Sequence, residues 1–206
     1  MNKHTLYLVA LYPCNDFPFI GESQGICAIS GYLQYLYGNS ITVNLYDQQL
    51  DKNDTIINDI LNEKPAIIGL SIKMFTFPQF EEFYFLLQTQ VFPVYHPLIV
   101  IGNSTAHFSG KDILMKYNDL IVSIGEGEIS IGDIYAYVNG KLSFEKIRNI
   151  MYYSNGKVLK SEYQYLDKKL IPFADRRHSK LYYDKGGEVY IEASRGCAYC
   201  SCSICE

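Results

Sequence analysis

Short apolar segments alternate with segments of helical spacing over residues 1–140, and this alternation limits the possible folds most strongly. The expected strands lie within residues 6–13, 41–47, 65–72, 97–103 and 119–128. The expected helices lie within residues 22–38, 52–64, 78–90, 111–116 and 129–138. Short, nearly continuous apolar strands separated by helices are typical of a parallel sheet covered on both faces. Residues 1–140 are therefore predicted to form a flavodoxin-like (Rossmann-like) α/β domain, a doubly wound parallel five-stranded sheet of order 2-1-3-4-5.

The pattern changes after Lys141. The stretch "IRNIMYYSNGKVLKSEY" predicts two strands joined at Asn155-Gly156, a strong β-hairpin signal. Residues 165–187 show no clear periodicity and are expected to form a connector that crosses a surface. The stretch "EVYIEASRG" predicts one further strand, which leads directly into a group of cysteines. We therefore divide the chain into an α/β domain (1–140), a hairpin and linker (141–186) and a third region (187–206).

Composition and charge exclude several classes of protein. The chain has 206 residues, of which 48% are hydrophobic and 19% charged, as expected of a folded protein. Its net charge is −4 and it has no basic run, which argues against a nucleic-acid partner. Its N-terminal apolar run is too short for a signal peptide or a membrane helix. We therefore expect a cytoplasmic protein with no membrane or nucleic-acid partner.

Four of the six cysteines fall within nine residues, at Cys197, Cys200, Cys202 and Cys205. Disulfides fit poorly, because these thiols are too close in sequence for two relaxed bridges and the expected compartment is reducing. Two C-x-x-C pairs could hold zinc, although a single residue separates them where zinc sites usually have about 15–20. Cys197, Cys202 and Cys205 could instead supply three thiolates to an iron–sulfur cluster with one open iron.

Cys14 and Cys27 are scattered along the chain. Each is expected to be a small buried hydrophobic residue rather than a metal ligand.

The stretch "YIEASRGCAYCSCSIC" resembles the start of a radical S-adenosylmethionine (SAM) barrel, where the first strand ends in Arg-Gly-Cys. "RGCAY" corresponds to the family's Arg-Gly-Cys-Pro-Tyr, and "CSIC" to its Cys-Ser-Phe-Cys. The resemblance implies a [4Fe-4S] cluster whose open iron chelates the amino and carboxylate groups of SAM. An electron from the cluster then cleaves SAM to a 5′-deoxyadenosyl radical. The family's usual spacing is C-x3-C-x2-C, one residue shorter than Cys197, Cys202 and Cys205, so Cys200 remains an alternative ligand.

The upstream sequence resembles the cobalamin-binding subgroup of that family, in which a flavodoxin-like domain binds cobalamin at the carboxyl ends of its strands. "IVIGNSTAHF" is similar to the subgroup's Gly-Gly-x-His-Ala segment, "IVSIGEGE" to its Gly-Glu-Gly-Glu turn, and "YLDKKLIPFADR" loosely to its linker. The resemblance implies that the residues nearest cobalamin include Gly102, Ser104, Gly125, Glu126 and Gly127. Ligands of open α/β sheets do bind at this edge, and small residues allow a bulky ring to approach the backbone.

A simpler interpretation of the "GEGE" turn stands beside this one. Gly125 and Gly127 could merely turn the chain, while Glu126 and Glu128 interact with the positive end of a helix.

Cobalamin proteins that coordinate cobalt with histidine carry Asp-x-His-x-x-Gly after the first strand. This chain has Asp16, Pro18 and Gly21 at that spacing, and proline cannot ligate cobalt. His107 is expected at the surface. We therefore expect cobalamin to bind without a protein histidine on cobalt.

The resemblance implies the N-terminal portion of a cobalamin-dependent radical SAM enzyme, most simply one that transfers a methyl group to an unactivated carbon. Its partners would be a small-molecule or peptide substrate and a reductant for the cluster. A complete barrel needs about 200 further residues, so we expect this chain to be the truncated front part of a longer enzyme, inactive alone. The alternative is a non-catalytic flavodoxin-like module with a zinc-thiolate knuckle.

Overall fold

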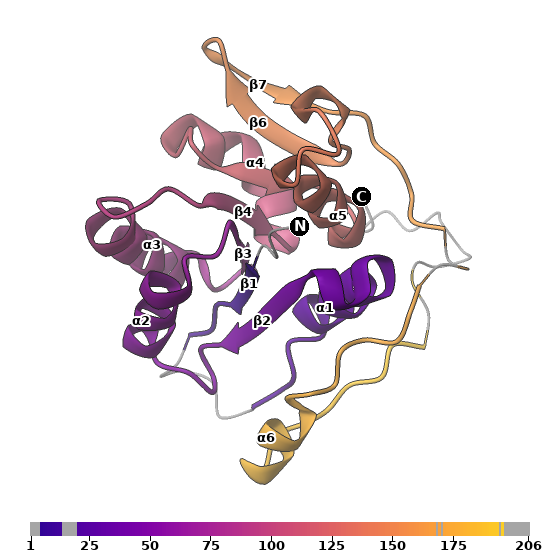
Figure 1. Ribbon diagram of the computed structural model, residues 1–206. Coiled ribbons are helices and arrows are strands. Elements are labelled where there is room, and N and C mark those ends of the chain that lie inside the picture. Colours follow the sequence, from indigo (N-terminus) through magenta and orange to yellow (C-terminus); the bar gives the residue numbers. More distant parts are fainter. Residues whose placement is uncertain (1–4, 14–19, 168, 170, 194, 196–206) are drawn as a thin grey trace, which may run out of the picture.

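The computed structural model describes residues 5–13, 20–167, 169, 171–193 and 195. The chain forms a seven-stranded sheet with helices on both faces (Figure 1). The strands are β1 (Thr5–Ala10), β2 (Thr42–Asp47), β3 (Ile67–Ser71), β4 (Leu98–Gly102), β5 (Ile121–Ser123), β6 (Ile150–Ser154) and β7 (Lys157–Lys160). The helices are α1 (Gln24–Tyr37), α2 (Asn53–Glu63), α3 (Phe77–Leu86), α4 (Ser104–Lys116), α5 (Gly127–Val138) and α6 (Ser179–Asp184). None of the helices in these ranges is long and apolar enough to span a membrane.

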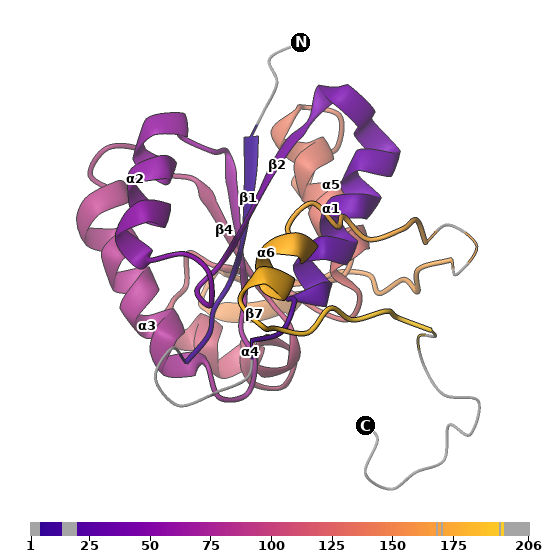
Figure 2. The same ribbon diagram turned by 90° about the horizontal axis from the view of Figure 1, so that it is seen from below.

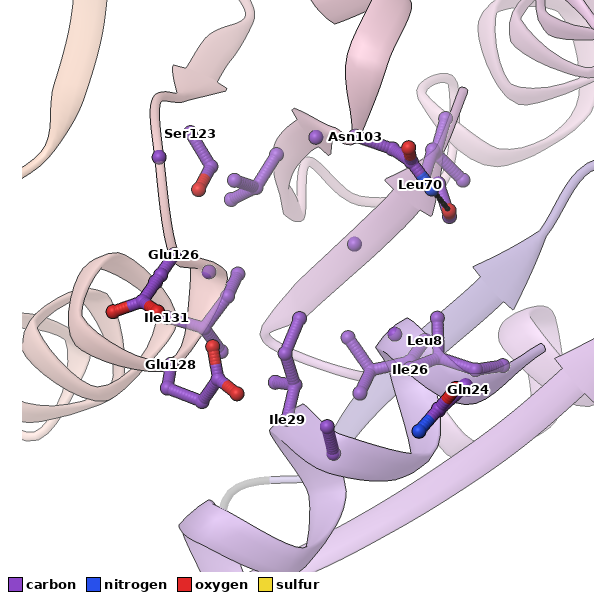
Figure 3. A pocket seen from close by; sticks show the side chains of 18 of the residues that line it. Leu8, Gln24, Ile26, Ile29, Leu70, Asn103, Ser123, Glu126, Glu128 and Ile131 are labelled. Atoms are coloured by element: carbon purple, nitrogen blue, oxygen red, sulfur yellow. Dashed lines mark hydrogen bonds between the residues drawn. The ribbon is translucent and has the colours of Figure 1, made fainter. Parts of the chain in front are cut away.

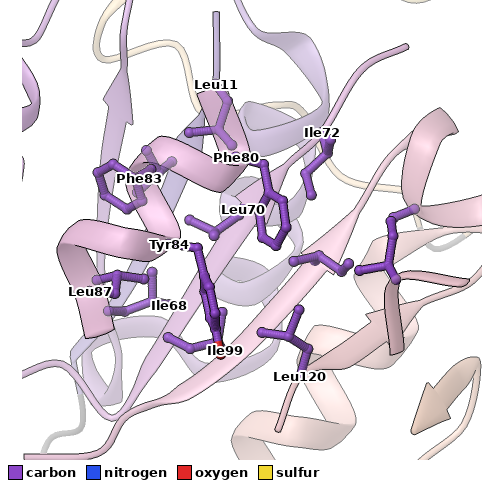
Figure 4. Packing of buried hydrophobic residues seen from close by; sticks show 14 of the residues in the cluster. Leu11, Ile68, Leu70, Ile72, Phe80, Phe83, Tyr84, Leu87, Ile99 and Leu120 are labelled. Atoms are coloured by element: carbon purple, nitrogen blue, oxygen red, sulfur yellow. The ribbon is translucent and has the colours of Figure 1, made fainter. Parts of the chain in front are cut away.

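The first five strands are parallel and lie in the order 2-1-3-4-5, which confirms the predicted topology. Helices α1 and α5 cover one face of the sheet, and α2 and α3 lie on the other (Figure 2). Two apolar layers result. One contains the aromatic residues Phe80, Phe83 and Tyr84 of α3 packed on the sheet (Figure 4). These three side chains are fully buried, whereas Phe85 of the same helix is 61% exposed.

The predicted hairpin is confirmed, and it extends the same sheet. β6 pairs antiparallel with β5, and β7 pairs antiparallel with β6. Asn155 and Gly156 both have positive φ, at 50° and 81°, as the tight turn requires. Ile150 belongs to the core under α1 and α5, and Met151 to the core on the opposite face. The sheet and both cores therefore continue past residue 140, where we expected the first domain to end.

Helix α4 begins at Ser104, earlier than the expected Lys111, because the preceding residue caps it. Asn103 has φ 77°, and its side chain accepts a hydrogen bond of 2.7 Å from the Ser104 amide. The first two turns of this helix contain several polar residues, but Ala106 and Gly110 are buried against the sheet. Gly110 has no side chain, which lets Val122 of β5 pack closely against the helix.

The linker packs against the α1 and β2 side of the domain. The hydroxyl of Tyr182, in α6, is buried and donates to Asp47 at 2.7 Å. Further along, only Glu188 makes a β-bridge, to Gly21, among the described residues of the strand expected at 188–196. The expected strand is therefore not formed there. A strand exists only where a neighbour supplies a ladder of hydrogen bonds, and in the described chain Ile20 and Glu22 alone provide such bonds to Glu188.

Candidate functional site

A crevice of about 360 Å³ opens at the carboxyl edge of the sheet, on the face covered by α1 and α5. It exists because side chains on this face become small where the strands end, as at Gly69, Ser71 and Gly102. Successive residues of a strand point to opposite faces. The intervening Leu70 and Ile101 are large and belong mainly to the core of the other face. The domain is thus closed on one face of the strand ends and hollow on the other.

The walls of the crevice are apolar and its rim is polar. Ile26 and Ile29 come from α1, and Ile131 comes from α5 on the opposite side (Figure 3). Gln24 adds a polar side chain to the lining, and the buried hydroxyl of Ser123 is paired with Ser130 Oγ at 2.6 Å. An apolar pocket with a few convergent polar groups is the usual form of a small-molecule or cofactor site.

Four of the five residues predicted to contact a cofactor line this crevice, namely Gly102, Gly125, Glu126 and Gly127. Ser104 is not among the lining residues, and its neighbour Asn103 takes that place. The side-chain Nδ2 of Asn103 donates a hydrogen bond to Ser71 Oγ at 3.0 Å, which ties the end of β4 to the end of β3.

The glycines of the crevice serve different purposes. Gly125 has φ 71°, so the turn itself favours glycine there. A Cβ on Gly127 would come within 2.8 Å of Ile29 Cδ1, so glycine allows α5 to pack on α1. The simpler interpretation of the "GEGE" turn therefore accounts for Gly125, whereas Gly127 is explained by helix packing and not by the turn. Gly102 differs, because a Cβ there would meet only Ser123 Cβ, at an ordinary 3.7 Å.

The acidic residues of the turn pair with an arginine from the third region of the chain. Glu128, 5% exposed in the first turn of α5, lies 2.6 Å from Arg195 Nη1, and Glu126 lies 3.8 Å from it. Glu192 contacts Arg195 Nε at 2.8 Å. Burial disfavours the charge of Arg195, but the carboxylates of Glu128 and Glu192 outweigh it and raise the pKa of the guanidinium. Glu192 and Arg195 both line the crevice.

Sequence reasoning missed the α1 side of the crevice and the arginine. Gln24, Ile26 and Ile29 were expected to belong only to a helix, and their spacing carries no sign of a ligand site. Arg195 was recognised only as part of "SRGC". The neighbouring acidic turn was its available signal, since an unpaired buried glutamate requires a cation.

The cysteine cluster lies outside the described residues, as do Cys14, Asp16 and Pro18. Cys27 is 2% exposed, and burial raises the pKa of its thiol to about 12, which confirms it as a buried hydrophobic residue. His107 is exposed and is not among the residues that line the crevice, as expected. In the part of the chain that the structure describes, no group of three or more His, Cys, Asp and Glu residues is arranged to bind a metal.

The strand order 2-1-3-4-5, with a crevice at the carboxyl edge, defines a flavodoxin-like (Rossmann-like) domain. The predicted resemblance to cobalamin-binding radical SAM proteins is confirmed by comparison with known structures. The structure of the cobalamin-dependent radical SAM enzyme OxsB with aqua-cobalamin and S-adenosylmethionine bound matches with a TM-score of 0.91 and 25% identity. The match covers 98% of this chain and 28% of the OxsB chain.

Two further comparisons agree. The 4′-phospho-dehydrooxetanocin synthase of Priestia megaterium is 25% identical over 208 residues, which cover 98% of this chain and 27% of that enzyme. The methyltransferase TsrM of Kitasatospora setae, solved with cobalamin and a [4Fe-4S] cluster, shares the fold at a TM-score of 0.61 and 14% identity, over 81% of this chain and 30% of TsrM. No protein-family model matches the chain. The chain spans under a third of the length of each of these relatives.

Proposed function

We propose that the crevice is a cobalamin site and that the chain is the cobalamin-binding portion of a radical SAM enzyme. The observation that carries this proposal is the hollow at the strand ends, formed by Gly69, Ser71 and Gly102. It lies beside β1 and β3, where the strand order reverses, which is where open α/β sheets bind their ligands. The similarity to OxsB over 98% of this chain supports cobalamin as that ligand.

The residues present suit a part of cobalamin rather than the whole molecule. A volume of about 360 Å³ is at the lower end for ligand pockets, and cobalamin is far larger than a typical ligand. The apolar walls at Ile29 and Ile131 suit a flat aromatic group, such as the base of the nucleotide tail. Gln24, Ser71 and Asn103 at the rim offer hydrogen bonds to the amide groups of the ring.

No histidine is among the described residues that line the crevice. Pro18 occupies the sequence position where a cobalt-ligating histidine could stand. We therefore propose that cobalamin binds without a protein histidine on cobalt. Changing His107 to Ala should leave the visible spectrum of the bound cobalamin unchanged.

We further propose that Cys197, Cys202 and Cys205 hold a [4Fe-4S] cluster that binds SAM, with Cys200 as the alternative ligand. When bound, these groups would supply radical and methyl-transfer chemistry, and the longer protein would methylate an unactivated carbon of a small-molecule or peptide substrate. The domain described here would bind and orient cobalamin and keep water from its apolar walls. A cytoplasmic reductant would supply the electron.

Two measurements test the proposal separately. Hydroxocobalamin titrated into the full chain should bind with a spectral change, and no change at high micromolar concentration would refute the cobalamin site. Anaerobic reconstitution of a longer chain that contains the barrel should give a brown protein with about four irons per chain. A double change of Cys202 and Cys205 to Ala should remove the iron, whereas Cys200→Ala should be milder. A colourless protein that retains zinc would favour a zinc-thiolate knuckle instead.

A further inference from the structure

The described residues 188–193 and 195, here called the crossing segment, meet the start of α1 at Glu188 and the start of α5 at Arg195. At its first end the segment is held by backbone hydrogen bonds. The amide of Glu22 donates to the Glu188 carbonyl at 2.9 Å, and the amide of Glu188 donates to the Ile20 carbonyl at 2.8 Å. Arg176 of the linker donates to the Tyr190 carbonyl at 2.5 Å. This end is fixed regardless of the side chains in the rest of the segment.

The second end is held by one arginine. Arg195 meets Glu128 at 2.6 Å, and both side chains are well buried, at 16% and 6% exposed. Its contact with Glu192 is internal to the segment, and Glu126 is more distant at 3.8 Å. Glu128 is therefore the main partner that ties Arg195 to the α/β domain.

Apolar packing contributes little between the two ends. Ile191 is 89% exposed, Val189 is 41% exposed, and Tyr190 is 42% exposed with its ring beside Gly21, at the first end. A segment with so little apolar burial is not held down by the hydrophobic effect, since that effect scales with the area removed from water. The position of its second end therefore depends on the Arg195–Glu128 pair.

We propose that Arg195 is a positioning residue, which holds the end of the crossing segment at the mouth of the crevice, two residues before Cys197 in the sequence. Cys197 follows two residues later, and two residues extend over no more than about 7 Å. Glu128 and Arg195 both line the crevice. The ion pair thus attaches to the crevice the part of the sequence that leads into the cysteines. A role of this ion pair in placing the two cofactors relative to each other rests on the proposed function. The attachment of the segment to α5 does not.

The test uses the full chain without cofactors and the variants Arg195→Gln, Glu128→Gln and both together. Chymotryptic cleavage after Tyr190, quantified by peptide mass spectrometry, should be at least about tenfold faster in each single variant, equivalent to about 1.4 kcal/mol. The double variant should add little, because either change alone breaks the same pair. Hydrogen–deuterium exchange of the amides in β1 and β3 should stay unchanged, which separates a released segment from a destabilised fold.

Two matched controls sharpen the result. Glu192→Gln removes a contact internal to the segment and should have a smaller effect than Glu128→Gln. Lys116→Gln breaks an exposed pair of equal length, with Glu81 at 2.6 Å, and should have no effect on residues 188–193. A Ser71→Cys reporter in the crevice, alkylated and quantified by peptide mass spectrometry, should react faster when Arg195→Gln is added.

Unchanged cleavage after Tyr190 in Arg195→Gln, or additive effects in the double variant, would overturn the positioning role. Faster cleavage after Tyr190 with an unchanged alkylation rate at position 71 would show that the segment does not cover the crevice, and would also overturn the positioning role. Failure of hydroxocobalamin to bind the unmodified chain would instead refute the proposed function. The cleavage and alkylation results would still decide whether Arg195 holds the segment.

Discussion

Replacing Tyr182 by Phe should measure how firmly the linker is attached to the α/β domain. The Tyr182 ring is 2% exposed, and its hydroxyl donates to Asp47 Oδ2 at 2.7 Å. A hydrogen bond to a charged group contributes about 1.5–3 kcal/mol. Asp47 also accepts from Ser23 Oγ at 2.5 Å and from the Gln49 side chain, so it is not left without partners. We therefore expect a loss near the lower value, about 1.5 kcal/mol.

Urea unfolding of the full chain, followed by circular dichroism, measures this loss. Tyr182→Phe should lower the midpoint without changing the slope, because the same surface is exposed on unfolding. Tyr182→Ala should lose about 3–5 kcal/mol, since it also leaves a cavity. Tyr183→Phe is the matched control, because Tyr183 is 74% exposed and its change should stay within about 0.5 kcal/mol. Equal midpoints for Tyr182→Phe and Tyr183→Phe would refute the reasoning.

Two further predictions concern stability. Burial, reinforced by nearby carboxylates, raises the pKa of Tyr46, Tyr84 and Tyr182 above the unfolded value near 10. The folded state therefore keeps these protons longer, and stability present below pH 10 should fall above it by about 1.4 kcal/mol per pH unit for each tyrosine. Urea midpoints between pH 9 and 11 measure this, and a slope that Tyr84→Phe does not flatten would count against it. A chain ending at residue 140 lacks β6 and β7, which supply Ile150 and Met151 to the two cores, and should melt less cooperatively than one ending at 187. Identical calorimetric transitions for the two chains would contradict that.

Local signals in the sequence were sufficient for the sheet and the hairpin. The buried parallel strands have continuous apolar stretches such as "AIIGL" because both faces are covered, and the turn at Asn155-Gly156 needs two residues that tolerate positive φ. The hairpin's place in the sheet was not predictable in the same way. Pairing of β5 with β6 depends on how α5 returns the chain to the sheet edge, and no local pattern encodes that path.

The candidate site was predictable on its loop side and not on its helix side. The "GEGE" turn could be located from its sequence, whereas Ile26 and Ile29 line the crevice only because α1 crosses the hollow above Gly69. The pairing of Arg195 with Glu128 joins residues far apart in the chain, so it follows from the tertiary fold alone. The small residues of β3 and β4 indicate a crevice only when it is known which face of the sheet each side chain points to.

Binding of hydroxocobalamin to Gly102→Leu tests the central claim most directly. A Cβ at Gly102 has ordinary space beside Ser123, so the fold should persist while the larger side chain occupies the crevice. Spectral titration of the full chain should show at least about tenfold weaker binding, equivalent to 1.4 kcal/mol. Ser104→Leu is the control, because Ser104 lies two residues along and does not line the crevice, and it should bind as the unmodified chain does. Unaltered affinity in Gly102→Leu, or equal losses in both variants, would contradict a cobalamin site in this crevice.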